Sequence, residues 1–289
     1  MVSNDVLWAT SFRHLNDSQE ADYATSVLQA KAEQIRSGLP EADHERFDKL
    51  TRLSGRRELQ LFLLCAAQES NLLSVWRGYG GEISYAVELD GRVPLLPVRL
   101  REGSTHPSPP KGYEPEWDEF DGQRFKIDDP DGHRVEYTEW LPVRYDTRGV
   151  KARVKRIAGL AQREPDTFRD AVLPYMNFHD IRMMEFKNPD FRDEREARMI
   201  FDVHPRWMFV AHRHGKYGVT PYIHVSAESE DNRKTPYSSW LQSPGKLPIR
   251  SVTLGPTPLG DEAVEATREF LEFNGYPDVK VNRSLIPFR

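Results

Sequence analysis

The sequence predicts an α+β fold in which helices flank a mixed central sheet. Segments with apolar residues at helical spacing and short β-rich segments follow one another irregularly, and this order favours α+β over a doubly wound sheet. The 289 residues contain no internal repeat and no shift in composition that would divide the chain. We therefore expect a single domain over residues 1–289.

Hydrophobic periodicity and turn residues predict the elements in chain order. Helices are expected over 16–38, from 151 onward, over 167–177 and over 261–273. Strands are expected over 6–8, 83–89, 135–145, 181–186, 197–203, 222–226, 249–254 and 279–281. The apolar run 59–67 fits either a buried strand or a buried helix, because periodicity alone does not separate the two.

Local signals set the ends of these elements. Asp17 can accept a hydrogen bond in the first turn of the first helix, and Glu20 stands three residues later, as in a capping box. Gly38 ends that helix. Turn dipeptides end two of the strands, at Asp90-Gly91 and at Gly255-Pro256.

Two segments call for separate interpretation. Residues 102–134 alternate proline with glycine, aspartate and glutamate, which is typical of a loop or lid. The basic residues of 151–156 begin a helix, and we interpret them as its solvated face. An RNA-binding patch is the alternative.

Composition restricts the class of protein. With 40 basic and 45 acidic residues the net charge is −5, which argues against a dedicated DNA-coating surface but leaves room for a local basic groove. No apolar run approaches ~18 residues, so no membrane span is expected. The N-terminus has no signal-peptide pattern, and the single Cys65 rules out a disulfide framework within the chain. These features predict a cytoplasmic protein.

Several catalytic motifs are missing from the sequence. It has no P-loop, no Rossmann glycine fingerprint, no His-Glu-x-x-His and no nucleophile elbow. His204, His212 and His214 lie close together in the sequence, but without a carboxylate pattern we interpret them as surface histidines rather than metal ligands. Cys65 lies inside an apolar run, where a thiol is usually inert packing.

Four short motifs are spread from one end of the chain to the other. They are Leu-Trp-Ala-Thr at 7–10, Trp-Arg-Gly-Tyr-Gly at 76–80, Glu-x-Glu-x-Arg at 194–198 and a closing segment over 284–289. In this order they resemble a bacterial family known only as domain-of-unknown-function family 2971. The layout of that family is similar to ADP-ribosyltransferase-like folds, so the resemblance implies NAD as a substrate.

The resemblance implies a site built from two carboxylates. Glu196 would polarise the ribose and stabilise the cation that forms when the nicotinamide bond breaks, and Glu194 would orient the acceptor. If 194–198 is a strand, both glutamates and Arg198 project from one face, which would perturb the carboxyl pKa values. A solvated charged face is the alternative. Replacing Glu196 by Gln is expected to stop turnover and to leave folding nearly intact.

The same resemblance implies further ligand contacts. Trp76 and Tyr79 would stack on the nicotinamide, Arg77 would bind phosphate, and Arg198 would also contact the cofactor. Asn16 and Asp17 would shape the first loop. The alternatives are that the two aromatic residues belong to the core and that Asp17 is a plain helix cap.

Two departures from the family pattern leave a non-catalytic relative open. The strand and helix that members usually carry before the Leu-Trp-Ala-Thr segment are lacking, and Cys65-Ala66-Ala67 replaces Cys-Phe-Ser. The first hypothesis is an ADP-ribosyltransferase or NAD glycohydrolase of toxin or phage-defence type, acting on a protein, a nucleic acid or water. The second is a non-catalytic nucleotide- or protein-binding module, and the third is an RNA-binding protein that uses 151–156.

Overall fold

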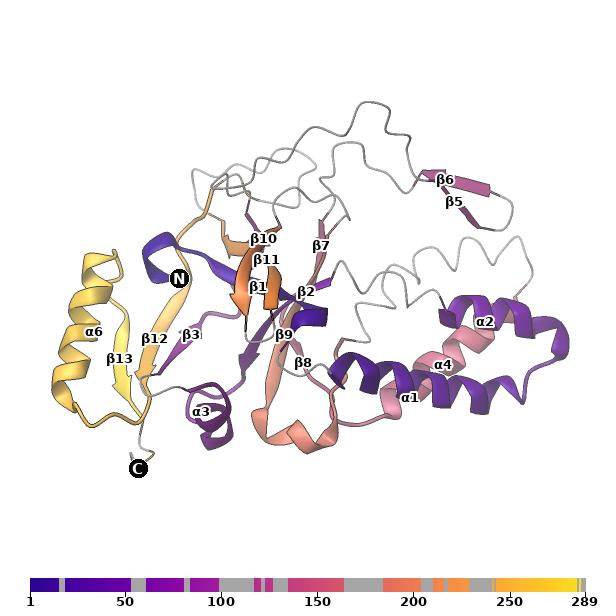
Figure 1. Ribbon diagram of the computed structural model, residues 1–289, viewed down its shortest axis with the longest axis horizontal. Helices are drawn as coiled ribbons and strands as arrows, with labels where there is room; N and C mark the ends of the chain where they lie inside the picture. The colour runs from indigo at the N-terminus through magenta and orange to yellow at the C-terminus, as the bar shows by residue number, and fades with distance from the viewer. Residues whose placement is uncertain are drawn as a thin grey trace.

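The architecture is mixed α+β, with a curled antiparallel sheet and several helices (Figure 1). A computed structural model describes residues 1–15, 19–52, 61–80, 84–98, 117–120, 123–126, 135–163, 184–203, 210–215, 218–228, 241, 243–284 and 286. The helices are α1 (Gln19–Arg36), α2 (His44–Arg52), α3 (Leu73–Tyr79), α4 (Arg148–Ala161) and α6 (Asp261–Phe273). Short 3₁₀ helices are η1 (Val2–Asn4), η2 (Phe12–His14), η3 (Glu41–Asp43) and η6 (Pro189–Glu194).

The strands form one large sheet and two small ones. They are β1 (Leu7–Ser11), β2 (Leu61–Ala67), β3 (Tyr85–Leu89), β4 (Leu95–Pro97), β5 (Trp117–Phe120), β6 (Gln123–Lys126), β7 (Val135–Tyr137), β8 (Leu141–Pro142), β9 (Glu196–Val203), β10 (Ala211–Gly215), β11 (Gly218–Ala227), β12 (Ile249–Leu254) and β13 (Lys280–Arg283). The large sheet has the order β10-β11-β1-β2-β9-β7, with β4 beside β11 and β8 beside β9. The small sheets are β13-β12-β3 and β5-β6.

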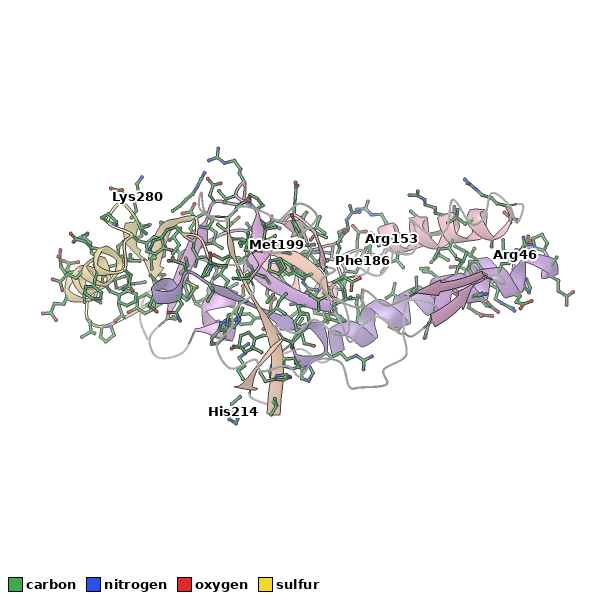
Figure 2. The ribbon with its side chains drawn as sticks, turned by 90° about the horizontal axis from the view of Figure 1, so that it is seen from above. Arg46, Arg153, Phe186, Met199, His214 and Lys280 are labelled. Carbon is green, nitrogen blue, oxygen red and sulfur yellow. The ribbon has the colours of Figure 1, made fainter. Side chains whose placement is uncertain are left out.

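The two faces of the large sheet pack against different layers, because side chains alternate along a strand. On one face, Leu61 and Leu63 of β2 pack with apolar residues of α1, α2 and α4. On the other face, Phe62 packs with residues of β12 and α6. Figures 1 and 2 show α1, α2 and α4 at one end of the molecule and α6 with β13 at the other. The first half of β2, from Leu61 to Leu63, is therefore buried on both faces.

Neighbouring strands β1 and β2 pair over only a short distance. Among the described residues they are in register at Thr10–Leu63 and Ser11–Phe62. In contrast, β1 pairs with β11 from Leu7 onward, and β2 pairs with β9 over its full length. The first half of β1 and the second half of β2 thus separate, and one side chain on each, Trp8 and Cys65, is exposed.

Several predicted elements agree with the structure. The predictions for 249–254 and 261–273 match β12 and α6 residue for residue, and the basic helix is α4. Within the apolar run 59–67, residues 61–67 form the strand β2, and the first two lie outside the described residues. The predicted helix 167–177 lies outside the described residues.

Other predictions were wrong in part. The interval 135–145 holds two short strands, β7 and β8, rather than one, and Pro142 sits in the second. Within the predicted strand 181–186 the described end is a turn with a single bridge from Phe186 to Arg144. The expected loop 102–134 contains the β5–β6 pair, and its remaining residues lie outside the described part. None of the helices in the described ranges is both long and apolar enough to cross a membrane.

Candidate functional site

The two glutamates come from different elements that meet at the start of β9. Glu194 ends the 3₁₀ helix η6, whose first turn is capped by the Asn188 side chain. Arg195 then adopts a left-handed conformation (φ 46°, ψ 51°), and β9 begins at Glu196. The expectation that one strand would project both glutamates was therefore wrong, because the left-handed residue interrupts the alternation. Glu196 and Arg198 do share a face of β9.

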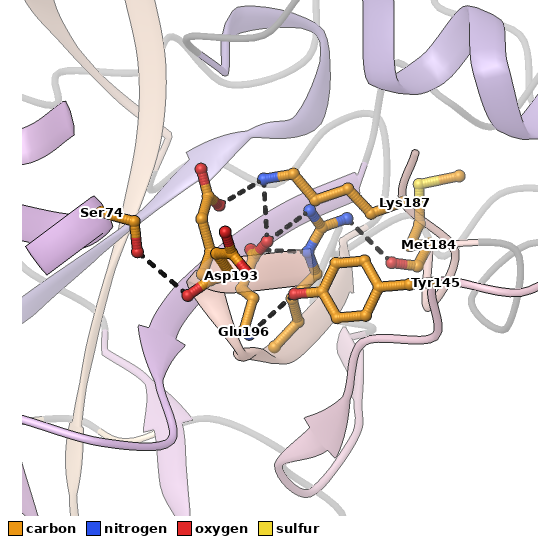
Figure 3. Close-up of polar contacts among 8 residues, drawn as sticks. Ser74, Tyr145, Met184, Lys187, Asp193 and Glu196 are labelled. Carbon is orange, nitrogen blue, oxygen red and sulfur yellow. Dashed lines mark hydrogen bonds and ion pairs between the residues drawn. The ribbon is translucent and has the colours of Figure 1, made fainter. Parts of the chain in front are cut away.

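The Glu196 carboxylate is the centre of a buried ion network (Figure 3). Arg198 donates from Nε to Oε1 at 2.7 Å and from its Nη2 to Oε2 at 2.9 Å, a two-point contact on one carboxylate. Lys187 Nζ donates to the same Oε2 at 3.1 Å. The Cys65 thiol also donates a hydrogen bond to this group. Glu196 is 6% exposed, so a solvated charged face is excluded for it.

This environment keeps Glu196 ionised. Burial raises the pKa of its carboxyl, but the hydrogen bonds and charges of Arg198 and Lys187, with the Cys65 hydrogen bond, outweigh burial. The net effect lowers the pKa of Glu196 to about 2. Arg198, itself 1% exposed, is held in turn by its Nη1 hydrogen bond to the Met184 carbonyl at 3.0 Å. The carboxylate is therefore a fixed negative charge at neutral pH.

Lys187 joins the second carboxylate to the first. Its Nζ donates to Glu194 at 2.7 Å, and its ammonium group lies 4.8 Å from the centre of the Phe191 ring. The Lys187 side chain is 3% exposed, whereas that of Glu194 is 18% exposed. Glu194 is thus the carboxylate of the pair that solvent or a ligand reaches more easily.

A bridge between distant segments positions Lys187. Arg144 and Phe186 form a parallel bridge, in which the Lys187 N–H donates to the Arg144 carbonyl at 3.1 Å. The neighbouring Tyr145 hydroxyl accepts from the Glu196 N–H at 2.9 Å. Burial raises the pKa of Tyr145, so the phenol stays protonated at neutral pH. Lys187 and Tyr145 belong to the site although no sequence motif indicated either of them.

Tyr79 lies beside the two carboxylates at the end of α3. Partial burial and then the Glu194 charge raise the pKa of its phenol to about 12, with smaller effects from Lys187, Glu196 and Cys65. Its side chain is nevertheless 60% exposed. The same helix is tied to η6, because the Ser74 hydroxyl donates to the Asp193 carbonyl at 3.0 Å (Figure 3). Tyr79 is therefore an exposed aromatic residue near the ion network.

The other two candidates on α3 lie apart from the carboxylates. Trp76 is half-buried, its indole N–H donates to Asn71 at 3.2 Å, and its ring packs so closely on Gly255 that a Cβ there would lie 3.0 Å from it. For Trp76 the structure therefore supports a packing role. Arg77 is exposed, and among the described residues it makes no contact with the network. Asn16 and Asp17 lie outside the described residues.

Cys65 differs from its predicted role as inert packing. It is exposed, because the second half of β2 extends beyond the part that pairs with β1. In the β2–β9 ladder it stands opposite Arg198, and Ala67 stands opposite Glu196. A serine at 67, as in the resembled family, would place its hydroxyl next to the carboxylate; this chain has a methyl group there.

The remaining histidine and basic candidates are spread over other surfaces. His212 and His214 are exposed on β10, His214 near the free end of the β10–β11 hairpin (Figure 2), and His204 lies outside the described residues. On α4, Arg153 turns inward to Glu185 and Phe186. Lys151, Lys155 and Arg156 stay exposed, as expected for a solvated helix face.

Neither a metal site nor a known relative accompanies the network in the part of the chain that the structure describes. In the described ranges, no three or more His, Cys, Asp or Glu residues are arranged to hold a metal ion. Comparison with protein-family models, curated proteins and solved structures found no significant match.

Acid should weaken the fold through Glu196. Its folded pKa of about 2 lies below the ordinary 4.5, so its contribution is present above pH 4.5 and is lost as the pH falls toward 2. The difference in pKa corresponds to about 3 kcal/mol of unfolding free energy. Urea unfolding near pH 5.5 and pH 3 should show a larger loss in the wild-type chain than in Glu196→Gln. Equal losses would mean that Glu196 is not the group responsible.

Proposed function

We propose that the ion network binds NAD and promotes cleavage of the bond between nicotinamide and ribose. The observation that carries this proposal is the buried Glu196 carboxylate, held ionised beside the exposed ring of Tyr79. A charge that is fixed before the substrate arrives stabilises a developing cation without reorganisation. An exposed aromatic ring beside it gives a flat surface for the nicotinamide.

The reaction is balanced without a metal or a redox partner. The bond from the ribose C1′ to the nicotinamide nitrogen breaks, and its electron pair leaves with nicotinamide. Positive charge then builds on the ribose, where the carboxylate stabilises it. Water or another nucleophile adds to C1′ and loses one proton. In this proposal Glu194, the more accessible carboxylate, orients the nucleophile and accepts that proton.

The cations of the network set the position of the carboxylates. Arg198 and Lys187 compensate the charge of Glu196, and Lys187 also holds Glu194 in place. A pair of buried cations beside two carboxylates makes the network close to neutral, so an additional positive charge is tolerated best near Glu194, the more accessible carboxylate. In this proposal the reacting ribose therefore lies on the side of Glu194 and Tyr79.

A second candidate function is nucleotide binding without turnover. One observation favours it: four donors from Arg198, Lys187 and Cys65 already reach the Glu196 carboxylate, which has about four acceptor positions. A carboxylate used in this way holds the fold together and contacts a ligand less. Binding of NAD with no release of nicotinamide would support this second function.

Protection of Cys65 tests whether NAD occupies the site. Cys65 is the only cysteine, it is exposed, and it contacts Glu196, so a maleimide reagent reports on this one position. Saturating NAD is expected to slow labelling several-fold, as measured by intact mass, because the bound molecule covers the thiol. Cys65→Ser provides the unlabelled control. An unchanged labelling rate under saturating NAD would contradict the proposal.

A further inference from the structure

An aromatic and cationic surface lies on the same face of the large sheet as Glu196. It consists of Trp8 and Thr10 on β1, Tyr222 and His224 on β11, and Arg213 on β10, and we name it the Trp8 platform. Registers place Trp8 opposite His224, Thr10 opposite Tyr222, and Arg213 opposite Thr220, two residues from Tyr222. Directly paired residues point to the same face, so these side chains form one surface.

The aromatic rings and the guanidinium group of the platform are in contact. Trp8 and Tyr222 have ring centroids 4.8 Å apart, and Tyr222 meets His224 edge-on at 5.1 Å. The Arg213 guanidinium carbon lies 5.1 Å from the Trp8 ring centre and 5.9 Å from that of Tyr222. Trp8 remains 45% exposed, so part of its ring is open to a ligand. An exposed tryptophan fixed by its neighbours is a pre-formed stacking surface.

Arg213 has no carboxylate partner among the described residues. Its terminal nitrogen donates to the Thr10 hydroxyl at 3.1 Å, but its buried Nε has no hydrogen-bond partner. No carboxylate in the described part of the chain forms an ion pair with it. The other inward-turned arginines contrast with this, since Arg198 pairs with Glu196 and Arg153 with Glu185. A half-buried cation without a carboxylate partner among the described residues attracts an anion, and the planar guanidinium suits phosphate oxygens.

The platform and the ion network are close enough to contact one ligand. On this face, β1 lies next to β2, and β2 lies next to β9, so Trp8 and Arg198 are at least two strand spacings apart, which is roughly 10 Å, and further apart where β1 and β2 separate. The exposed Cys65 stands on β2 between them, where β1 and β2 separate. A molecule with a flat base and phosphates at one end and a reactive ribose at the other spans this distance.

We propose that the Trp8 platform binds the adenosine–phosphate end of the substrate, with the base on Trp8 and a phosphate on Arg213. This inference rests on the proposed function, in which the opposite end of NAD lies at Glu194 and Tyr79. It assigns the adenosine–phosphate end of the substrate to its own group of residues. It also predicts that adenine nucleotides without nicotinamide bind to this chain.

Calorimetric titration with AMP tests the platform directly. AMP is expected to bind the wild-type chain, and Arg213→Gln and Trp8→Leu should each raise its dissociation constant at least tenfold. Arg268→Gln, which makes the same substitution at an exposed position on α6, should leave AMP affinity unchanged. Thermal unfolding of each variant checks that it is folded.

The outcomes separate this inference from the proposed function. AMP binding that depends on Arg213 and Trp8, in a chain that releases no nicotinamide, would keep the platform and overturn NAD cleavage. Nicotinamide release with a KM unaffected by Arg213→Gln would keep the cleavage and overturn the platform. Absence of AMP binding, or equal AMP affinity in all variants, also overturns it. Tighter binding of a single-stranded RNA hexamer than of AMP would identify a nucleic acid as the occupant and overturn the assignment made here.

Discussion

Replacing Glu196 by Gln is expected to lower kcat for release of nicotinamide from NAD by roughly 10²- to 10³-fold, the size of effect seen when one preorganised electrostatic group is removed. Gln keeps the shape of the side chain but removes the fixed negative charge that faces the developing cation. KM should change less than kcat, because the charge acts mainly in the transition state. Nicotinamide is measured by chromatography over time, with the variant at matched concentration.

Glu69→Gln is the matched control for this variant. Glu69 makes a surface ion pair with Arg195, and both side chains are more than half exposed. The same chemical change there should leave kcat and KM as in the wild-type chain. Turnover by Glu196→Gln at the wild-type rate would contradict the role given to Glu196.

The structure also changes what is expected for the stability of Glu196→Gln. From the sequence, Glu196→Gln is expected to fold nearly as the wild-type chain does, because the site was assumed to be partly open. Glu196 is instead buried between two cations, so the variant leaves Lys187 and Arg198 with a neutral acceptor. Some loss of stability is therefore expected. Glu194→Gln, at a more exposed carboxylate, should unfold closer to the wild-type temperature while still slowing transfer to the nucleophile.

Replacing Arg198 by Met is expected to lower the unfolding free energy by about 3–5 kcal/mol. Met fills a similar volume but donates no hydrogen bond, so the buried Glu196 carboxylate loses its two-point partner and the Met184 carbonyl loses a donor. Lys187 alone then compensates two carboxylates. Urea unfolding at pH 7, followed by circular dichroism, measures the change.

Arg195→Met and a double variant provide the comparison. Arg195 is exposed and pairs with Glu69 at the surface, so its replacement should cost at most about 1 kcal/mol. In Arg198→Met/Glu196→Gln the unpaired buried charge is gone, and part of the lost stability should return. Similar losses in the two single variants, or no recovery in the double variant, would show that the ion pair is not what stabilises this region.

Local signals account for the elements that were predicted correctly. Gly255 directly follows β12, and Gly275, with φ at 80°, takes the left-handed position just after α6. The two glutamates of the Glu-x-Glu-x-Arg spacing do lie close together, because Lys187 donates to both. The residues that contact these carboxylates could not be predicted from local sequence. Lys187 and Tyr145 reach Glu196 only because Arg144 and Phe186 form a bridge across 42 positions of the sequence (186 − 144).

Tertiary pairing decided the positions at which the predictions were wrong. Cys65 has apolar neighbours in the sequence, yet it is exposed because β1 stops pairing with β2 before that residue. Trp76 and Tyr79 lie on the same short helix, but one packs on Gly255 and the other stands at the ion network. Arg213 gave no signal at all, since its environment depends on the strand order β10-β11-β1.

The most direct test of NAD cleavage is release of nicotinamide by the purified wild-type chain, measured beside Glu196→Gln. We expect that nicotinamide release grows with time and with protein concentration in the wild-type sample and that it falls to near background in the variant. Release at the background rate from a folded wild-type chain that protects Cys65 when NAD is present would contradict cleavage and support nucleotide binding without turnover.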